Sequence, residues 1–190
     1  MTRIKPSAAF ADFEPQDIGP GDRINLGVAG ILGHRPEVAG ALGSLKAALS
    51  STGTLPPRLL ELVRLRIAFH NQCRSCMSVR YQSAIDDGLT EDAVCSLERP
   101  ADAPDLAPAE RSALRYADLF ATDHLLIDDA VYDDLRQHFT EAELVELGMN
   151  CAIDVGIGRL SATWDVTDDV PDEFRTAVAP WSAPGVVASG

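Results

Sequence analysis

The chain has few aromatic residues, few cysteines and no excess of positive charge. Phenylalanine, tyrosine and tryptophan make up 6% of its 190 residues, and there are four cysteines. Lysine and arginine total 16 against 29 aspartates and glutamates, which gives a formal net charge of −13. Because a surface of this sign repels nucleic acid and anionic lipid, we expect neither a nucleic acid nor a membrane as partner.

Long hydrophobic runs are also missing. The most apolar long stretch, residues 144–164, is interrupted by Glu146, Asp154 and Arg159, which is typical of a buried helix and not of a membrane-spanning one. The first ten residues carry two basic side chains but no continuous apolar segment, so they do not resemble a secretory signal. We therefore expect a cytoplasmic protein.

The hydrophobic pattern predicts helices. Apolar residues recur at helical spacing in residues 37–49, 56–71, 110–121 and 128–139. Thr140 and Glu143 predict a capping box at the start of one more long helix. No segment shows the strict alternation of a half-buried strand, so the predicted fold class is all-α.

The chain is long enough for one domain with its own core, and we expect flanking segments on both sides of it. Residues 1–35 are rich in proline and glycine and lack a sustained period. They predict an extended arm with at most one short turn of helix, which either wraps a neighbouring subunit or is a partly disordered tail. Residues 36–165 would form the helical domain, and residues 166–190 a tail whose Trp181 docks on the body or on a partner.

The residues that suggest chemistry lie between Glu61 and Arg80. Pro56-Pro57 predicts a helix start, and an interruption is expected near Asn71-Gln72, so that a second helix would run from Cys73 to Asp87. Thiolates at a helix start are favoured by its unpaired amides and dipole. In that helix Cys73, Cys76 and Arg80 would share one face, with the two sulfurs close enough for a disulfide.

The pattern Glu61, eleven residues, Cys73, two residues, Cys76 resembles the signature of the carboxymuconolactone decarboxylase and AhpD-like alkylhydroperoxidase superfamily. The likeness extends over residues 36–165. It implies an AhpD-like bundle of about six to eight helices, a homo-oligomer, and a thiol-dependent peroxidase or disulfide oxidoreductase that requires no bound cofactor. Such an enzyme reduces hydrogen peroxide or an organic hydroperoxide and is itself reduced by a thiol or dithiol.

The resemblance also implies residue roles. Cys76 would attack the peroxide oxygen, and Cys73 would resolve the resulting sulfenic acid as a disulfide. In the family a glutamate, here Glu61, and a histidine four residues after the second cysteine form a proton relay. Arg80 occupies the histidine position, and a guanidinium stays protonated and cannot accept a proton. Its charge would still favour a thiolate, and restoring the family residue with Arg80→His is expected to raise turnover.

Two of these residues have alternative interpretations. Glu61 either pairs with Arg64 or Arg80 as a structural ion pair, or serves in proton transfer, and both roles are compatible. His70 either replaces the missing base, if the chain turns back there, or is a hydrogen-bonded structural histidine.

We do not expect a metal site, because His70, Cys73 and Cys76 would supply three soft ligands but the sequence offers no fourth at ligand spacing. Two other functions stay open beside the peroxidase. One is decarboxylation of a muconolactone-type acid, in which a redox cysteine pair has no evident part. The other is a non-catalytic oligomeric scaffold that has lost the relay histidine.

Overall fold

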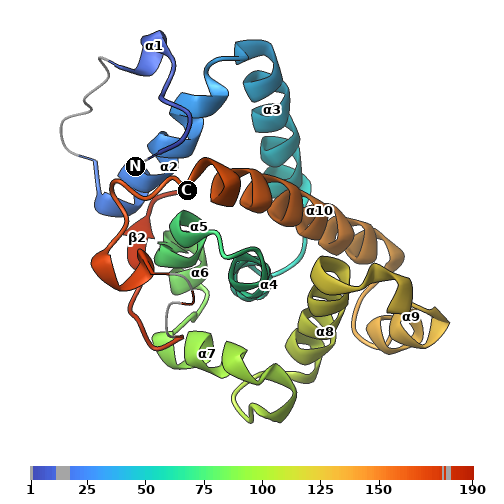
Figure 1. The fold of residues 1–190 in the computed structure, drawn as a ribbon. Helices are drawn as coiled ribbons and strands as arrows, with labels where there is room; N and C mark the ends of the chain where they lie inside the picture. Colours follow the sequence, from blue (N-terminus) through green and yellow to red (C-terminus); the bar gives the residue numbers. More distant parts are fainter. Residues whose placement is uncertain (1, 12–17, 177, 179–180) are drawn as a thin grey trace.

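The computed structural model describes residues 2–11, 18–176, 178 and 181–190, and these are mostly helical (Figure 1). The longer helices are α2 (Pro20–Leu32), α3 (Pro36–Thr52), α4 (Pro57–Asn71), α8 (Pro108–Thr122) and α10 (Glu141–Trp164). The short helices are α1 (Ala8–Ala11), α5 (Arg74–Ser78), α6 (Gln82–Asp86), α7 (Glu91–Cys95) and α9 (Asp129–Leu135). The two strands are β1 (Val79–Tyr81) and β2 (Val186–Ala188).

The predicted all-α fold class is confirmed, since the only strands in the described residues are these two, of three residues each. The described chain has ten α-helices, more than the six to eight expected, because several of them are single turns. None of the described helices combines the length and the apolar character needed to cross a membrane.

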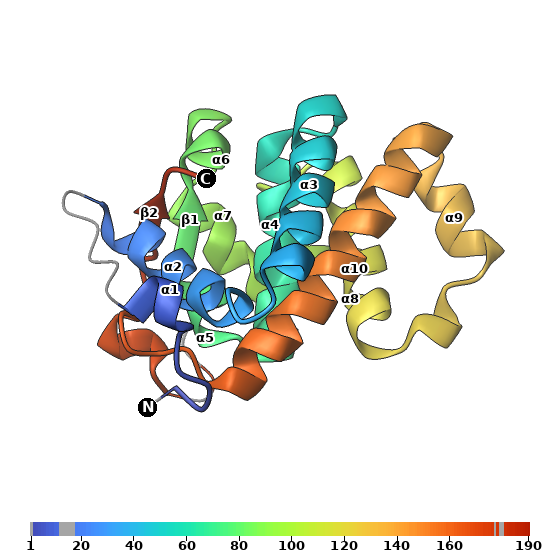
Figure 2. The same cartoon turned by 90° about the horizontal axis from the view of Figure 1, so that it is seen from above.

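Helix α4 is the centre of the fold. It packs against α8 and α10 along its length and against α5 and α6 at its ends (Figures 1 and 2). Leu62, Val63, Leu65 and Ile67 have no exposed surface. Apolar residues on several sides of a helix can all be buried only if the helix lies inside a core, so the sequence of α4 accounts for its position.

The predicted break after α4 is confirmed. Gln72 adopts the left-handed conformation with φ 50°, and the amide of Cys73 donates to the carbonyl of Ala68 at 3.1 Å. This turn directs the chain into α5. The capping box at the start of α10 is also present, because the hydroxyl of Thr140 accepts from the amide of Glu143, whose carboxylate accepts from the amide of Thr140.

The single helix predicted from Cys73 to Asp87 is wrong. Helix α5 ends at Ser78, and the chain extends as β1 before helix α6 begins at Gln82. Strand β1 pairs in parallel with β2, and Arg80 lies opposite Val187. Three residues are too few to show an alternating pattern, and their partner strand comes from the far end of the sequence, so no local signal predicts this strand.

The extended arm predicted for residues 1–35 is wrong over most of the part that the structure describes, because Pro20–Leu32 form a regular helix. Its glycines allow close packing. A Cβ at Gly21 would lie 2.4 Å from the carbonyl oxygen of Val187 in β2, and a Cβ at Gly27 would lie 2.9 Å from the side chain of Val166. Residues that suggested a chain without helix therefore serve helix packing. Pro15 of this segment lies outside the described residues.

The expected docking of Trp181 on the body of the protein is confirmed. Its ring stacks on Phe69 of α4 with the ring centroids 3.4 Å apart and the planes 20° apart. Val170, Phe174 and Ala183 are buried in the same cluster, together with Met77 of α5. Residues after α10 therefore cover the segment that carries the two cysteines.

Candidate active site

Cys73 and Cys76 form a disulfide at the start of α5. Their Cα atoms are 5.2 Å apart, and the amide of Cys76 donates to the sulfur of Cys73 at 3.3 Å. Cys73 has no exposed surface, whereas Cys76 is partly exposed and lines a cleft. The two sulfurs are therefore unequal, and only that of Cys76 is open to a ligand from the cleft.

Glu61 forms a buried ion pair with Arg64, one turn further along α4. The Nε and Nη2 atoms of Arg64 donate to the carboxylate at 2.6 and 2.7 Å, and Glu61 is 3% exposed. The amide of Tyr81 donates to the same carboxylate at 3.2 Å. Burial opposes the charge of Arg64, but Glu61 holds the pKa of this guanidinium above its ordinary value.

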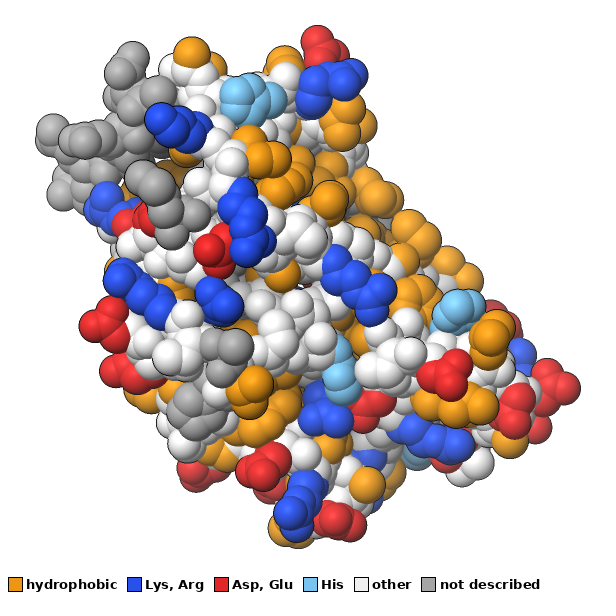
Figure 3. Space-filling model, viewed as in Figure 1, with side chains coloured by type: hydrophobic (Ala, Val, Ile, Leu, Met, Phe, Trp, Pro, Cys, Tyr) orange, Lys and Arg blue, Asp and Glu red, His pale blue; other side chains and the backbone are white. Residues whose placement is uncertain are grey.

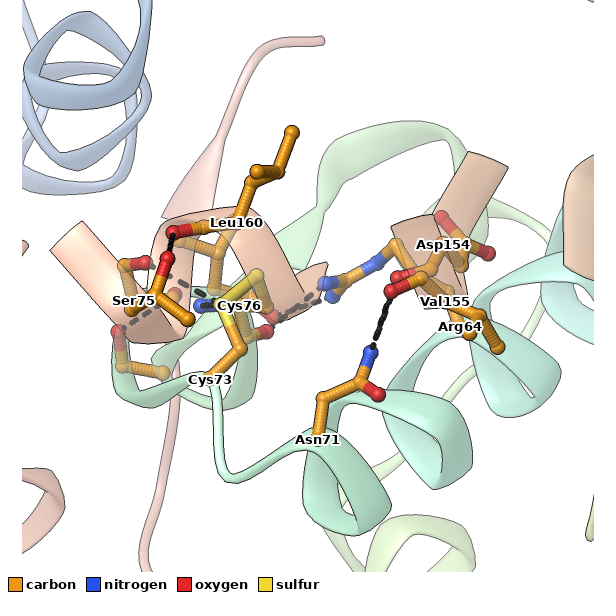
Figure 4. Close-up of a disulfide and its surroundings, with 11 residues drawn as sticks. Arg64, Asn71, Cys73, Ser75, Cys76, Asp154, Val155 and Leu160 are labelled. Atoms are coloured by element: carbon orange, nitrogen blue, oxygen red, sulfur yellow. Dashed lines mark hydrogen bonds between the residues drawn. A yellow bond between two sulfur atoms is a disulfide. The ribbon is translucent and has the colours of Figure 1, made fainter. Parts of the chain in front are cut away.

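Arg64 also connects α4 to the cysteine segment. It donates from Nη1 to the carbonyl of Cys76 at 2.8 Å (Figure 4). Its Nη2 donates to the carbonyl of Val79, also at 2.8 Å. Its guanidinium lies 5.0 Å from the ring centroid of Tyr81. One side chain thus fixes Glu61, the end of the disulfide loop and the first residue of β1 relative to one another.

Arg80 points away from this group. Its Nε and Nη2 atoms donate to Glu91 at 3.1 and 3.3 Å, and Nη1 donates to the carbonyls of Met77 and Val79 at 2.7 and 3.1 Å. It is 2% exposed, and burial lowers the pKa of its guanidinium against the opposing effect of Glu91. A Cβ on Gly185 would lie 2.7 Å from Cζ of Arg80, so the backbone before β2 covers it.

The shared face predicted for Cys73, Cys76 and Arg80 is therefore wrong. Helix α5 is only five residues long, and β1 turns the side chain of Arg80 in a direction that a continued helix would not give. Of the two partners considered for Glu61, the structure selects Arg64.

A large cleft opens beside Cys76. Its volume is about 1460 Å³, above the range of roughly 300 to 1,000 Å³ that is common for small-molecule sites. Helices α2 and α3 form one wall, and α4, α5 and α10 form the other. The lining is mainly apolar, with Leu42, Leu49, Leu60, Ile153 and Ile157 among its residues. Cys76, Glu61, Arg64 and Asp154 are polar or reactive residues of the same lining.

Comparison with known proteins agrees with this arrangement. Residues 36–119 match the Carboxymuconolactone decarboxylase family. An uncharacterised protein of Mycobacterium tuberculosis is 36% identical over 117 residues, which cover 60% of this chain and 40% of that protein. The chain therefore matches less than half the length of this curated relative.

Two solved structures share the fold. An AhpD-core, peroxidase-related protein from Ralstonia eutropha superposes with a TM-score of 0.62 at 21% identity, covering 83% of this chain and 82% of that one. A variant of the debrominase Bmp8 in complex with 2,3,4-tribromopyrrole gives a TM-score of 0.67 at 20% identity, over 89% and 94% of the two chains. Residues 36–119 thus match the carboxymuconolactone decarboxylase family, and the chain has the fold of AhpD-like proteins.

Within this AhpD-like fold, His70 lies outside the cysteine site. Its Nε2 is 2.6 Å from Oδ1 of Asp118, which also accepts from Arg66 at 2.5 Å. His70 and Arg66 line a second, smaller cavity of about 590 Å³ together with Trp181 and Cys95. The geometry therefore favours the interpretation of His70 as a hydrogen-bonded structural residue.

Asp154 is the site residue that the sequence analysis did not single out. It lies on α10 and lines the cleft that also contains Cys76, Glu61 and Arg64. Burial raises its pKa to about 7. The positive charge of Arg64 opposes this rise, and the negative charge of Glu61 adds to it. An acidic residue among the apolar residues in the middle of α10 was the available signal, because a charge in such surroundings usually needs a partner or a function.

The described residues contain no group of three or more histidine, cysteine, aspartate or glutamate side chains arranged to hold a metal ion.

Gly158, one turn after Asp154 on α10, has a packing role, because a Cβ there would lie 2.5 Å from Nδ2 of Asn71. Asn71 uses this close approach to donate to the carbonyl of Asp154 at 3.0 Å (Figure 4). The end of α4 and the middle of α10 are thereby fixed beside the disulfide.

Proposed function

We propose that this AhpD-like protein is a thiol-dependent peroxidase that reduces hydroperoxides through Cys76 and Cys73. The observation that carries the proposal is the difference between the two bonded sulfurs. Cys76 faces an open cleft, and Cys73 is fully buried behind it at bonding distance. A peroxidatic sulfur must meet the substrate, whereas a resolving sulfur needs only to meet the first sulfur.

The reaction follows from these positions. The thiolate of Cys76 attacks the outer oxygen of the hydroperoxide, so that an S–O bond forms, the O–O bond breaks and the alkoxide leaves as an alcohol after taking a proton. The thiol of Cys73 then attacks the sulfenic sulfur, which forms the disulfide and releases water. A dithiol reductant returns both cysteines to thiols by exchange.

The lining of the cleft supports an organic hydroperoxide over hydrogen peroxide. Leucine and isoleucine side chains from α3 and α10 form much of the wall of the cleft that Cys76 lines. Burial of the apolar part of a substrate there contributes about 25 cal/mol per Å². We place the reaction in the cytoplasm, where thiol reductants keep a cysteine pair of this kind in turnover.

Peroxide turnover by the purified protein with a dithiol reductant tests the proposal. We expect consumption of cumene hydroperoxide, with hydrogen peroxide slower. Cys76→Ser should abolish turnover, and Cys73→Ser should stop at a sulfenic acid that dimedone can trap. Cys95→Ser is the matched control, because Cys95 is a free thiol outside the disulfide. If the wild-type protein consumes neither hydroperoxide, or if Cys76→Ser retains full turnover, the proposal is wrong.

We also propose that the protein is a homo-oligomer in which a second copy covers α3. None of the seventeen residues of α3 is buried. Val38 and Leu45 on this helix are 52% and 39% exposed, and Val145, Met149 and Leu160 on α10 are exposed as well. Figure 3 shows hydrophobic side chains gathered over α3 and the adjacent part of α10. A long apolar face of this kind usually marks an interface.

A further inference from the structure

The proposed reaction needs a proton at a defined place. An alkoxide is a poor leaving group, so cleavage of the O–O bond is faster when an acid protonates the departing oxygen. The family supplies protons through a glutamate and a histidine. Here Arg80 replaces the histidine, and it lies against Glu91 under the backbone of Gly185.

The other two acid–base candidates from the sequence are held by other partners. The carboxylate of Glu61 accepts hydrogen bonds from Arg64 and from the amide of Tyr81. His70 is bonded to Asp118 and lines the other cavity. Neither residue is therefore free to protonate a substrate bound next to Cys76.

Asp154 differs from Glu61 and His70 in its position and in its hydrogen bonding. It lines the cleft with Cys76, and Figure 4 shows the guanidinium of Arg64 between the disulfide and Asp154. The hydrogen bond from Asn71 to its backbone carbonyl fixes this turn of α10. Within the described part of the chain no group donates a hydrogen bond to its carboxylate, so it is available to a ligand.

The charges around Asp154 suit an acid that works near neutral pH. From α4 it faces Glu61, whose charge favours the protonated form, and Arg64, whose charge opposes it. From α3 it faces Lys46, which also opposes protonation. Burial outweighs these effects and raises the pKa of Asp154 to about 7, whereas a general acid is most effective when its pKa is near the working pH.

We infer that Asp154 is the general acid of the cysteine site, and this inference rests on the proposed peroxidase function. Protonated Asp154 gives its proton to the departing oxygen, directly or through one water, and regains a proton from solvent before the next cycle. One cycle turns Cys76 thiolate, hydroperoxide and protonated Asp154 into Cys76 sulfenic acid, alcohol and ionised Asp154, so atoms and charge balance.

The test compares electrophiles that differ in whether their leaving group needs a proton. The leaving group of cumene hydroperoxide is an alkoxide, which needs a proton. The leaving groups of peracetic acid and iodoacetamide are acetate and iodide, which do not. Reduced wild-type protein and Asp154→Asn are mixed with each reagent, and modification of Cys76 is followed by quenching and mass spectrometry. Asp154→Asn preserves the size of the side chain, and the two control reagents report whether Cys76 is still accessible and reactive.

We expect Asp154→Asn to lose about 10²-fold in rate with cumene hydroperoxide at pH 7 and to stay within about twofold of wild type with the other two reagents. The wild-type rate with cumene hydroperoxide should rise with pH as Cys76 ionises and then fall above pH 7, because Asp154 loses its proton there. The variant should lack this fall. Glu146→Gln is the matched control, because Glu146 lines the same cleft but is held by the amides of Thr54 and Leu55. It should keep the wild-type pH profile.

An equal loss with all three reagents would overturn the inference, and so would an unchanged rate and pH profile with cumene hydroperoxide. If the wild-type protein reacts with no hydroperoxide, the proposed function is wrong. The position of Asp154 beside Cys76 is then tested separately by the rate at which iodoacetamide alkylates Cys76. Asp154→Asn should then be alkylated faster above pH 7, because a negative charge that opposes the Cys76 thiolate is gone. An unchanged alkylation profile would overturn it.

Discussion

Arg64 holds the carboxylate of Glu61 in two hydrogen bonds, from Nε to Oε2 at 2.6 Å and from Nη2 to Oε1 at 2.7 Å. The pair is buried between α4 and the cysteine segment, and Arg64 extends it to the carbonyls of Cys76 and Val79. Glu61, the glutamate of the family motif, therefore serves here as the counter-charge that keeps Arg64 in place.

Arg64→Met should destabilise the protein by about 3 to 5 kcal/mol, because it leaves the buried carboxylate of Glu61 without its counter-charge. Urea unfolding measures this loss. The double variant Arg64→Met, Glu61→Gln should recover much of it, since no unpaired charge remains. Arg136→Met is the control, because Arg136 pairs with Asp133 and Glu141 on the surface and should give no measurable change. Equal losses in the single and double variants would contradict this explanation.

Arg80→His should not raise peroxidase turnover, in contrast to the expectation from the family resemblance. The side chain at this position is directed toward Glu91 and covered by Gly185, so a histidine there would not reach Cys76. Steady-state turnover at pH 7 with cumene hydroperoxide measures the effect. A clear gain in a well-folded variant would show that position 80 communicates with the sulfurs.

Arg80→Met should reduce the free energy of unfolding by about 1 to 3 kcal/mol, because the carbonyl of Met77 loses its buried donor and the carbonyl of Val79 loses one of its two arginine donors. Glu91 is 44% exposed at its side chain, so water can replace its partner. Denaturant unfolding of the oxidised protein measures the loss. A variant as stable as wild type would mean that the carbonyl of Met77 finds another donor.

Asp154 should make stability depend on pH. Its pKa is about 7 in the folded protein and near 3.8 in the unfolded chain, so the folded state binds more protons between these values. The stability of the wild type should therefore fall as the pH rises from about 4 to 7, by roughly 2 to 4 kcal/mol, and its contribution should be constant above that range. Asp154→Asn should lack this fall. Urea unfolding of both oxidised proteins from pH 4 to 8 gives the difference, and parallel curves would refute the assignment.

Cys76 should be the first cysteine to react when the reduced native protein is treated with iodoacetamide. Cys151 has no exposed surface, and burial holds the pKa of its thiol above the ordinary value, so it should be labelled only after denaturation. Peptide mass spectrometry gives the order of labelling. Treatment with hydroperoxide before alkylation should protect Cys73 and Cys76 together, and two free thiols after that treatment would count against the linked pair.

Leu45→Glu should shift the protein toward monomers, because it places a charge on the exposed apolar face of α3. Light scattering at micromolar concentration measures the mass. Leu125→Glu is the control, since Leu125 is 83% exposed and lies outside α3 and α10. A monomeric wild-type protein would refute the proposed assembly.

The features that the sequence predicted correctly depend on neighbouring residues. The period of apolar residues, the break at Asn71-Gln72 and the cap at Thr140 are all settled within a few positions of the chain. The close approach of Cys73 and Cys76 is local in the same sense, and it too was predicted.

The features that it predicted wrongly depend on distant segments. Strand β1 exists because β2 pairs with it, and helix α2 fits because Gly21 lets it lie on the backbone of β2. The direction of Arg80 follows from β1. Asp154 was noticed as an interruption of an apolar stretch, but its place beside Arg64 is known only once α10 is packed on α4.

The parallel pairing of Val79 with Val186 also has a consequence for the order in which the protein matures during synthesis. The strand beside the cysteines cannot find its partner until nearly all of the described residues have left the ribosome. Until then Arg80 lacks its cover, and the contact between Phe69 and Trp181 is absent. Helices α4, α8 and α10 can assemble earlier, so the surroundings of the disulfide are the last part of the fold to be completed.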